Sequence, residues 1–70
     1  METILDKVLN HKQKRIQTVA AKLFVSNKIR LTNAGEIEAA FKIRGILGKD
    51  LIDIKRVDYS SDHIVTLKEI

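Results

Sequence analysis

The sequence contains no cysteine and no proline, and its aromatic residues are two phenylalanines and one tyrosine. Without cysteine the chain has no disulfide, no thiolate nucleophile and no zinc site built on sulfur, and we expect a cytoplasmic protein. With so few aromatic side chains, we expect no platform on which the bases of single-stranded nucleic acid could stack. The composition therefore excludes several classes of site before any motif is considered.

Long apolar runs are missing as well. Nothing in the sequence approaches the roughly 18 consecutive apolar residues of a membrane span, so a membrane partner is not expected. Residues 1–7 contain two acids with no apolar run behind them, which argues against a secretory signal. Apolar residues still make up 44% of the 70 residues, and this content predicts a packed core within a single small domain over residues 1–70.

Acidic residues are missing between Asp6 and Glu36. That stretch contains seven of the thirteen lysines and arginines, and the formal net charge of the whole chain is +4. Such an asymmetry indicates a partner of opposite sign, which we expect to be double-stranded DNA or an acidic protein surface. A solvated surface whose lysines only maintain solubility is the alternative, and an anionic lipid surface would require an exposed apolar face.

Residues 3–24 predict one long amphipathic helix. No proline or glycine interrupts them, and Thr3 with Asp6 suits a helix start, where acids are favourable. Projected at about 100° per residue, the apolar side chains fall within one narrow arc. This arc consists of Leu5, Leu9, Ile16, Ala20 and Leu23, with Val8 and Val19 at its edge.

The same projection places basic side chains on the opposite side of this helix. Side chains three or four residues apart point in the same direction, so a row of cations suits a row of phosphates or an acidic surface. The row is the predicted binding site, and it consists of Lys7, His11, Lys14, Arg15, Thr18 and Lys22.

Residues 23–31 leave more than one local structure open. Residues 29–31 alternate apolar, basic and apolar, as a short extended connection or a third strand does. A β-hairpin centred on residues 26–28 is the alternative, because Phe24 and Val25 on one side and Ile29 and Leu31 on the other are suitable strand residues.

A second helix is predicted over Ala34–Leu47. Asn33 followed three residues later by Glu36 resembles a capping box, and Gly48 predicts the end of the helix. Its apolar residues cover more than half of the helical circumference, so we expect this helix to be central in the fold. A wide apolar arc also suits a homodimer, and the residues expected at that interface are Ile37, Phe41 and Arg44.

The last twenty residues have the composition of β-strands and predict a C-terminal antiparallel hairpin with its turn at residues 60–62. In the first strand Val57 and Tyr59 share one face, whereas Ile52 and Ile54 have the opposite phase. We therefore expect a bulge or bend near residues 55 and 56.

Together these elements predict an α+β fold in the order helix, helix, strand, strand. Residues 33–69 resemble the half of a winged helix-turn-helix domain that consists of a helix and its wing, with residues 50–52 leading into one strand and residues 65–67 forming the other. The sequence before residue 33 departs from that pattern because it lacks a compact helix and a tight turn. Asp58 and Asp62 at the tip of the hairpin also depart from it, since they repel phosphate.

No constellation of catalytic or metal-binding residues is recognisable. His11 and His63 are far apart and lack the spacing of metal ligands. The run of residues 60–63, Ser-Ser-Asp-His, contains the groups of a nucleophilic triad, but triad members come from separate elements, and this run is better explained as a turn. Gly45 and Gly48 form no phosphate-binding loop. We therefore expect no enzymatic activity, no metal, no cofactor and no small-molecule substrate.

Overall fold

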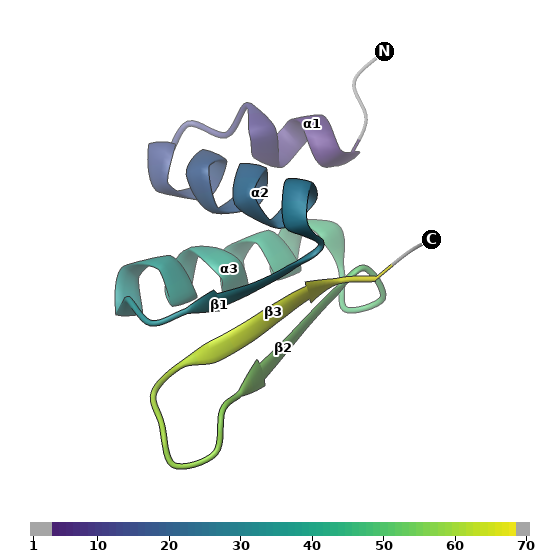
Figure 1. Cartoon of the computed structure of the whole chain (residues 1–70). Helices are drawn as coiled ribbons and strands as arrows, with labels where there is room; N and C mark the ends of the chain where they lie inside the picture. The colour runs from purple at the N-terminus through teal and green to yellow at the C-terminus, as the bar shows by residue number, and fades with distance from the viewer. Residues whose placement is uncertain (1–3, 69–70) are drawn as a thin grey trace.

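The computed structural model describes residues 4–68, and within these residues it contains three helices and three strands (Figure 1). The helices are α1 (Ile4–Leu9), α2 (Lys14–Ser26) and α3 (Ala34–Leu47), and the strands are β1 (Lys28–Leu31), β2 (Ile52–Arg56) and β3 (His63–Leu67). The predicted α+β class is confirmed, whereas the helix count and the order of elements differ from the prediction. None of the helices in this range is both long enough and apolar enough to cross a bilayer.

The strands form one antiparallel sheet in the order β1-β3-β2. Val65 of the central strand lies opposite Ile29 of β1 and Ile54 of β2, so apolar residues of all three strands share one face. On that face Leu31, Ile52 and Val65 are buried. By the same alternation the other face carries Lys28, Arg30, Asp53, Lys55, Ile64 and Thr66.

Residues 28–31, which precede α3, form the third strand that was one of the structures predicted from their alternation of apolar and basic residues. β1 pairs with β3 along its whole length. The alternative hairpin at residues 26–28 is wrong, because α2 continues to Ser26. Asn27 ends α2 with a φ of 63° and an N–H that donates to the carbonyl of Leu23. Asparagine tolerates this left-handed conformation better than most residues, so the chain turns directly from helix into strand.

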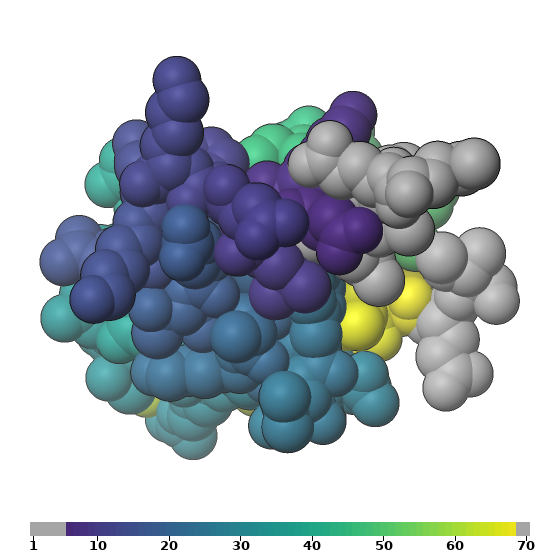
Figure 2. Space-filling view, turned by 90° about the horizontal axis from the view of Figure 1, so that it is seen from above, coloured from purple at the N-terminus to yellow at the C-terminus, as the bar shows by residue number. Residues whose placement is uncertain are grey.

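Helices α2 and α3 pack side by side on the apolar face of the sheet, and α1 packs on both helices (Figure 1). Seen from above in Figure 2, α1 and α2 cover the molecule and hide most of the sheet. Within the described residues, every buried side chain is apolar. The largest fully buried ones are Ile16, Leu23, Ile43, Ile52, Val8, Val19 and Val65.

Helix α3 has the predicted bounds. Oδ1 of Asn33 accepts hydrogen bonds from the N–H groups of Gly35 and Glu36, at 2.8 and 3.3 Å, which satisfies donors of the first turn. At the other end Gly48 has a φ of 101°, a conformation that favours glycine, and its N–H donates to the carbonyl of Arg44. Residues adjacent to the helix therefore fix both of its ends. For that reason the bounds of α3 could be predicted from the sequence.

The C-terminal hairpin is present, but the expected bulge is wrong. β2 pairs residue by residue with β3 along its whole length, and no extra residue interrupts the register. Val57 and Tyr59 lie in the loop after β2 and are not strand residues. Side chains alternate between the two faces of a sheet only within a strand. Because Val57 and Tyr59 follow the strand, their phase relative to Ile52 and Ile54 gives no evidence of a bulge.

The prediction of a single long N-terminal helix is wrong, since residues 10–13 separate α1 from α2. Gln13 precedes α2 with an extended backbone, φ −84° and ψ 120°. His11 takes part in two hydrogen bonds at this break. Its Nδ1 accepts the N–H of Gln13 at 3.1 Å, and its carbonyl accepts a hydrogen bond from the side-chain amide of Gln17.

The break brings the N-terminal segment closer to the length of the sheet. A continuous helix over residues 3–24 would be about 33 Å long, whereas strands of four or five residues extend only about 17 Å. Because the chain folds back, α1 packs on α2 and α3, where Val8 is fully buried and Leu9 is 37% exposed. Thr3 and the side chain of Leu5 lie outside the described residues.

The burial of Val8 and the partial exposure of Leu9 in α1 lead to a prediction about stability. We expect Val8→Ala to lower the free energy of unfolding by about 2 kcal/mol, because it removes both γ-methyl groups from the core and leaves a cavity. Leu9→Ala removes more atoms but should cost less than about 1 kcal/mol, since that side chain is partly hydrated. Urea denaturation of both variants measures the difference. A larger loss for Leu9→Ala would instead support the continuous helix, in which Leu9 points inward.

Candidate functional site

One face of α2 packs on the core and the opposite face is exposed. Because an α-helix has 3.6 residues per turn, positions 14, 18 and 22 lie in one row along the helix. All three are exposed, and so is Arg15 beside them. Four of the six predicted binding residues therefore share one surface: Lys14, Arg15, Thr18 and Lys22.

A hollow of about 460 Å³ lies between this face and the start of α3. The lining contains three cations and one carboxylate, so its formal net charge is +2. Its residues are Lys14, Arg15, Thr18, Val19 and Lys22 from α2, together with Asn33 and Glu36 at the start of α3.

The cations of the hollow differ in their partners. Nζ of Lys22 lies 3.4 Å from Oε2 of Glu36, and these side chains are 56% and 30% exposed. A pair this exposed contributes less than about 1 kcal/mol to stability. Lys14 and Arg15, by contrast, have no carboxylate within salt-bridge distance among the described residues. The positive charge of these two side chains is therefore uncompensated by the fold.

Thr18 contributes to this surface in a different way. Its Oγ1 donates a hydrogen bond to the carbonyl of Lys14, at 3.0 Å, one turn earlier in α2. The hydroxyl hydrogen is thus already engaged within the helix, and the oxygen remains as an acceptor. Thr18 separates the two lysines of the row without adding a free donor.

Lys7 and His11 do not join the other predicted residues at the hollow. Lys7 lies on α1 and His11 in the connection between the helices, and neither contributes to the lining. Since the predicted row assumed an unbroken helix, the break at residues 10–13 divides it. The six residues therefore do not form one row along a single helix, and four of them remain together on α2.

The residues expected at a dimer interface lie on α3 with different degrees of exposure. Phe41 is 45% exposed, and its ring meets that of His63 edge-on, with centroids 5.9 Å apart. Ile37 is partly buried against the core, and Arg44 is partly buried as well. α3 packs on α2, α1, β1 and β2, so its central position within the chain accounts for most of its wide apolar arc.

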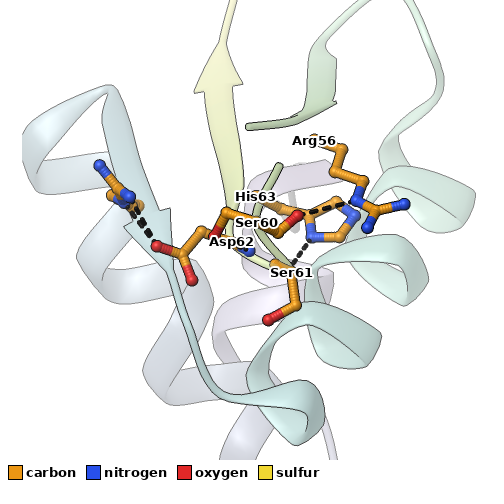
Figure 3. Close-up of polar contacts among 6 residues, drawn as sticks. Arg56, Ser60, Ser61, Asp62 and His63 are labelled. Carbon is orange, nitrogen blue, oxygen red and sulfur yellow. Dashed lines mark hydrogen bonds and ion pairs between the residues drawn. The ribbon is translucent and has the colours of Figure 1, made fainter. Parts of the chain in front are cut away.

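Polar side chains also gather at the hairpin loop, where they close the turn (Figure 3). Oδ2 of Asp62 accepts hydrogen bonds from Nε and Nη2 of Arg30, at 2.9 and 2.6 Å, and so joins the loop to β1. Nε of Arg56 donates to the carbonyl of Ser60 at 2.8 Å. The hydroxyl oxygen of Ser60 accepts the N–H of Asp62 at 3.0 Å. Two of the basic residues therefore serve the structure of this loop.

The same contacts explain the Ser-Ser-Asp-His run as a turn. Nδ1 of His63 lies 2.9 Å from the backbone oxygen of Ser61 (Figure 3). Asp62 pairs with Arg30 and not with the imidazole. In the part of the chain that the structure describes, no hydrogen bond joins His63 to a serine hydroxyl, and no three potential metal ligands gather.

Sequence reasoning missed the contribution of α3 to the hollow. Asn33 and Glu36 were recognised as residues of a helix start, but not as neighbours of α2. Lys22 and Glu36 are 14 positions apart, and no local period connects residues at that distance. The one available signal was charge, because Glu36 is the first acid after the acid-free stretch.

The chain matches no protein-family model, no curated protein and no solved structure. The similarity to winged helix-turn-helix domains extends only to the order of α3, β2 and β3. Between α2 and α3 the chain forms strand β1 in place of a tight turn.

Proposed function

We propose that this protein is a small, non-enzymatic, DNA-associated regulator or accessory protein that uses α2 against the phosphates of a duplex. The observation that carries the proposal is the pair of uncompensated cations, Lys14 and Arg15, beside Lys22 on one exposed face. Lys7 and His11 do not line the hollow beside this face. A cytoplasmic location stays a prediction from the lack of cysteine.

The spacing on α2 supports contact with one DNA strand. Lys22 is eight positions after Lys14, which places their backbones about 12 Å apart along the helix axis. Each DNA strand carries a phosphate about every 3.4 Å of duplex axis, so the row is long enough to reach several phosphates. Contacts of this kind position a protein on DNA without reading its sequence. The binding should therefore be strongly salt-dependent and weakly sequence-dependent.

Removing the uncompensated cations should weaken binding to duplex DNA. For Lys14→Ala combined with Arg15→Ala, we expect a loss of affinity of roughly tenfold or more at low salt. The slope of log K against log salt should become shallower by roughly 0.9 for each phosphate that the variant no longer neutralises. Fluorescence anisotropy of a labelled duplex at several salt concentrations measures both quantities.

A matched control removes the same charge beside the other end of α2, about 20 Å along the helix axis from Lys14, where the N–H of Leu67 donates to the carbonyl of Asn27. Lys49 and Lys68 are exposed and lie near each other, because the N–H of Lys68 donates to the carbonyl of Leu51. Replacing both with alanine should change the affinity and the slope much less, since distant charges are screened beyond roughly 10 Å. The proposal fails if the unchanged protein shows no binding at low salt, or if the control pair matters as much as Lys14 and Arg15.

An acidic protein surface is the second candidate partner, and one observation favours it. Val25 is 85% exposed and lies eleven residues after Lys14, which brings it back to within about 20° of the same direction on α2. The basic row therefore ends in an exposed apolar side chain. Partial burial of such a side chain at a protein interface is favourable, whereas phosphates offer it no contact.

Nuclease treatment separates the two candidates. If the partner is a protein, it should stay bound to the immobilised chain in a nuclease-treated lysate, and Val25→Ser should reduce its capture while leaving duplex affinity unchanged. If the partner is DNA, nuclease should release everything that is captured. In another outcome, a protein is retained equally well by the Val25→Ser variant and by the variant that lacks Lys14 and Arg15. That result would argue against α2 as its docking surface.

A homodimer is part of the proposal, supported by the half-exposed ring of Phe41 next to the partly buried Ile37 and Arg44. Mass measurement in solution by light scattering tests it directly. We expect twice the chain mass of 8.0 kDa, and we expect Phe41→Ser to shift the population toward the monomer. A monomer at all concentrations up to the millimolar range would reject the dimer.

A further inference from the structure

The guanidinium of Arg15 lies against the first turn of α3, over Gly35. A Cβ atom at position 35 would lie 2.9 Å from Cζ of Arg15 and closer still to its Nη1. The same atom added to Gly45, in the same helix, would meet nothing within 4 Å. The contact of Arg15 with α3 therefore depends on the missing side chain at position 35.

The backbone conformation does not explain why position 35 is glycine. Gly35 is the second residue of α3, and the positive φ values of the described residues belong to Asn27, Gly48 and Tyr59. Within a helix, glycine is less favourable than alanine, because it loses more conformational freedom on folding. What glycine provides here is space for the guanidinium and, less closely, for Oδ1 of Asn33, which the added Cβ would approach to 3.1 Å.

Arg15 brings an unused set of donors to this place. A guanidinium has five N–H donors in a planar fork that matches the oxygens of a phosphate. Within the described residues, no hydrogen bond or ion pair engages those donors. Arg15 also borders both the hollow of about 460 Å³ and a smaller one of about 120 Å³, which Gly35 and Glu38 line as well. An anion in the larger hollow would meet Arg15 together with Lys14 and Lys22.

The amides at the start of α3 do not supply this site. The N–H groups of Gly35 and Glu36 already donate to Oδ1 of Asn33. Oε2 of Glu36 lies 3.4 Å from Nζ of Lys22, so a carboxylate already holds one of the cations that an anion would meet. The candidate ligands are therefore side chains, and Glu36 is a competitor for one of them.

We propose that the larger hollow is a discrete phosphate site in which Arg15, seated over Gly35, is the main ligand. Lys14 and Lys22 flank the anion, and Glu36 competes with it for Lys22. Gly35 is then a positioning residue, because it touches no ligand and acts through Arg15. The inference rests on the proposed function, since it assigns one phosphate of the DNA backbone to this hollow.

Two glycine substitutions test the positioning role. Gly35→Ala should displace the guanidinium, the flexible end of a side chain, without unfolding the protein, whereas Gly45→Ala makes the same chemical change in open space. Gly45→Ala should raise the thermal midpoint, because alanine favours the helix. In Gly35→Ala the same gain is offset by the added Cβ, which lies 3.1 Å from the capping Oδ1 of Asn33. We expect inorganic phosphate to bind Gly35→Ala at least roughly fivefold more weakly, as the loss of a charge-assisted hydrogen bond would give. Gly45→Ala should bind it like the unchanged protein.

The measurement is a titration of backbone amide signals by nuclear magnetic resonance. Inorganic phosphate is added to the full chain, with sodium chloride at equal ionic strength as the reference titration. Phosphate should shift the amides of Lys14, Arg15 and Gly35 beyond the effect of chloride. Glu36→Gln provides an independent readout, because removing the competing carboxylate should tighten phosphate binding roughly two- to fivefold.

The outcomes separate this site from the proposed function. Equal phosphate affinity of the two glycine variants, or shifts no larger than those of chloride, would overturn the site. If the Lys14 and Arg15 double variant still loses duplex affinity in that case, DNA association stands without a discrete phosphate site. If phosphate binds as expected but no duplex does, the site stands and the proposed DNA partner is rejected.

Discussion

The packing of α2 beside α3 on one face of a three-stranded sheet is the contact on which the rest of the structure depends. The described residues bury no polar side chain, so non-directional apolar burial holds these layers together. Ala20 on α2 and Ala39 and Ala40 on α3 are buried at the core, and small side chains permit close approach of helices. This proximity fixes the distance from the exposed face of α2 to the start of α3, and thereby the width of the hollow.

The short strands limit what can be placed above them. Only α2 and α3 fit on the sheet, so the N-terminal segment folds back as α1 and buries Val8 on the helices. That rearrangement separates Lys7 and His11 from the residues of α2. The size of the sheet therefore decides which cations remain together, although no strand residue takes part in the hollow.

The fold also changes the meaning of the charge asymmetry in the sequence. Lys22 and Arg30 belong to the acid-free stretch, yet the fold pairs them with Glu36 and Asp62 from the acidic half. Exposed pairs of this kind contribute little to stability, but they reduce the local positive charge. Five cations of the acid-free stretch take part in no ion pair among the described residues: Lys7, Lys12, Lys14, Arg15 and Lys28. Three of these five lie within four positions at the start of α2, so the fold leaves a local excess of positive charge there.

The sequence by itself determined the elements whose ends are set by neighbouring residues. Asn33 and Gly48 fixed α3, and strand composition with a polar turn fixed the hairpin, because caps and turns act over three or four residues. The break in the first helix also had a local sign, a run of six polar residues from Asn10 to Arg15 that leaves almost two turns without an apolar side chain. The helical projection missed it because both flanks happen to fit one register.

Only the tertiary structure decided the pairing of β1 with β3, the burial of Val8 in place of Leu9, and the seat of Arg15 over Gly35. Each of these depends on segments far apart in the sequence. Their relative positions follow from how the apolar faces pack and from how long the sheet is. Periodicity predicts the direction in which a side chain points from its own helix. It does not predict which residues of another element face that side chain. The candidate site consists of side chains from two helices, so periodicity alone could not locate it.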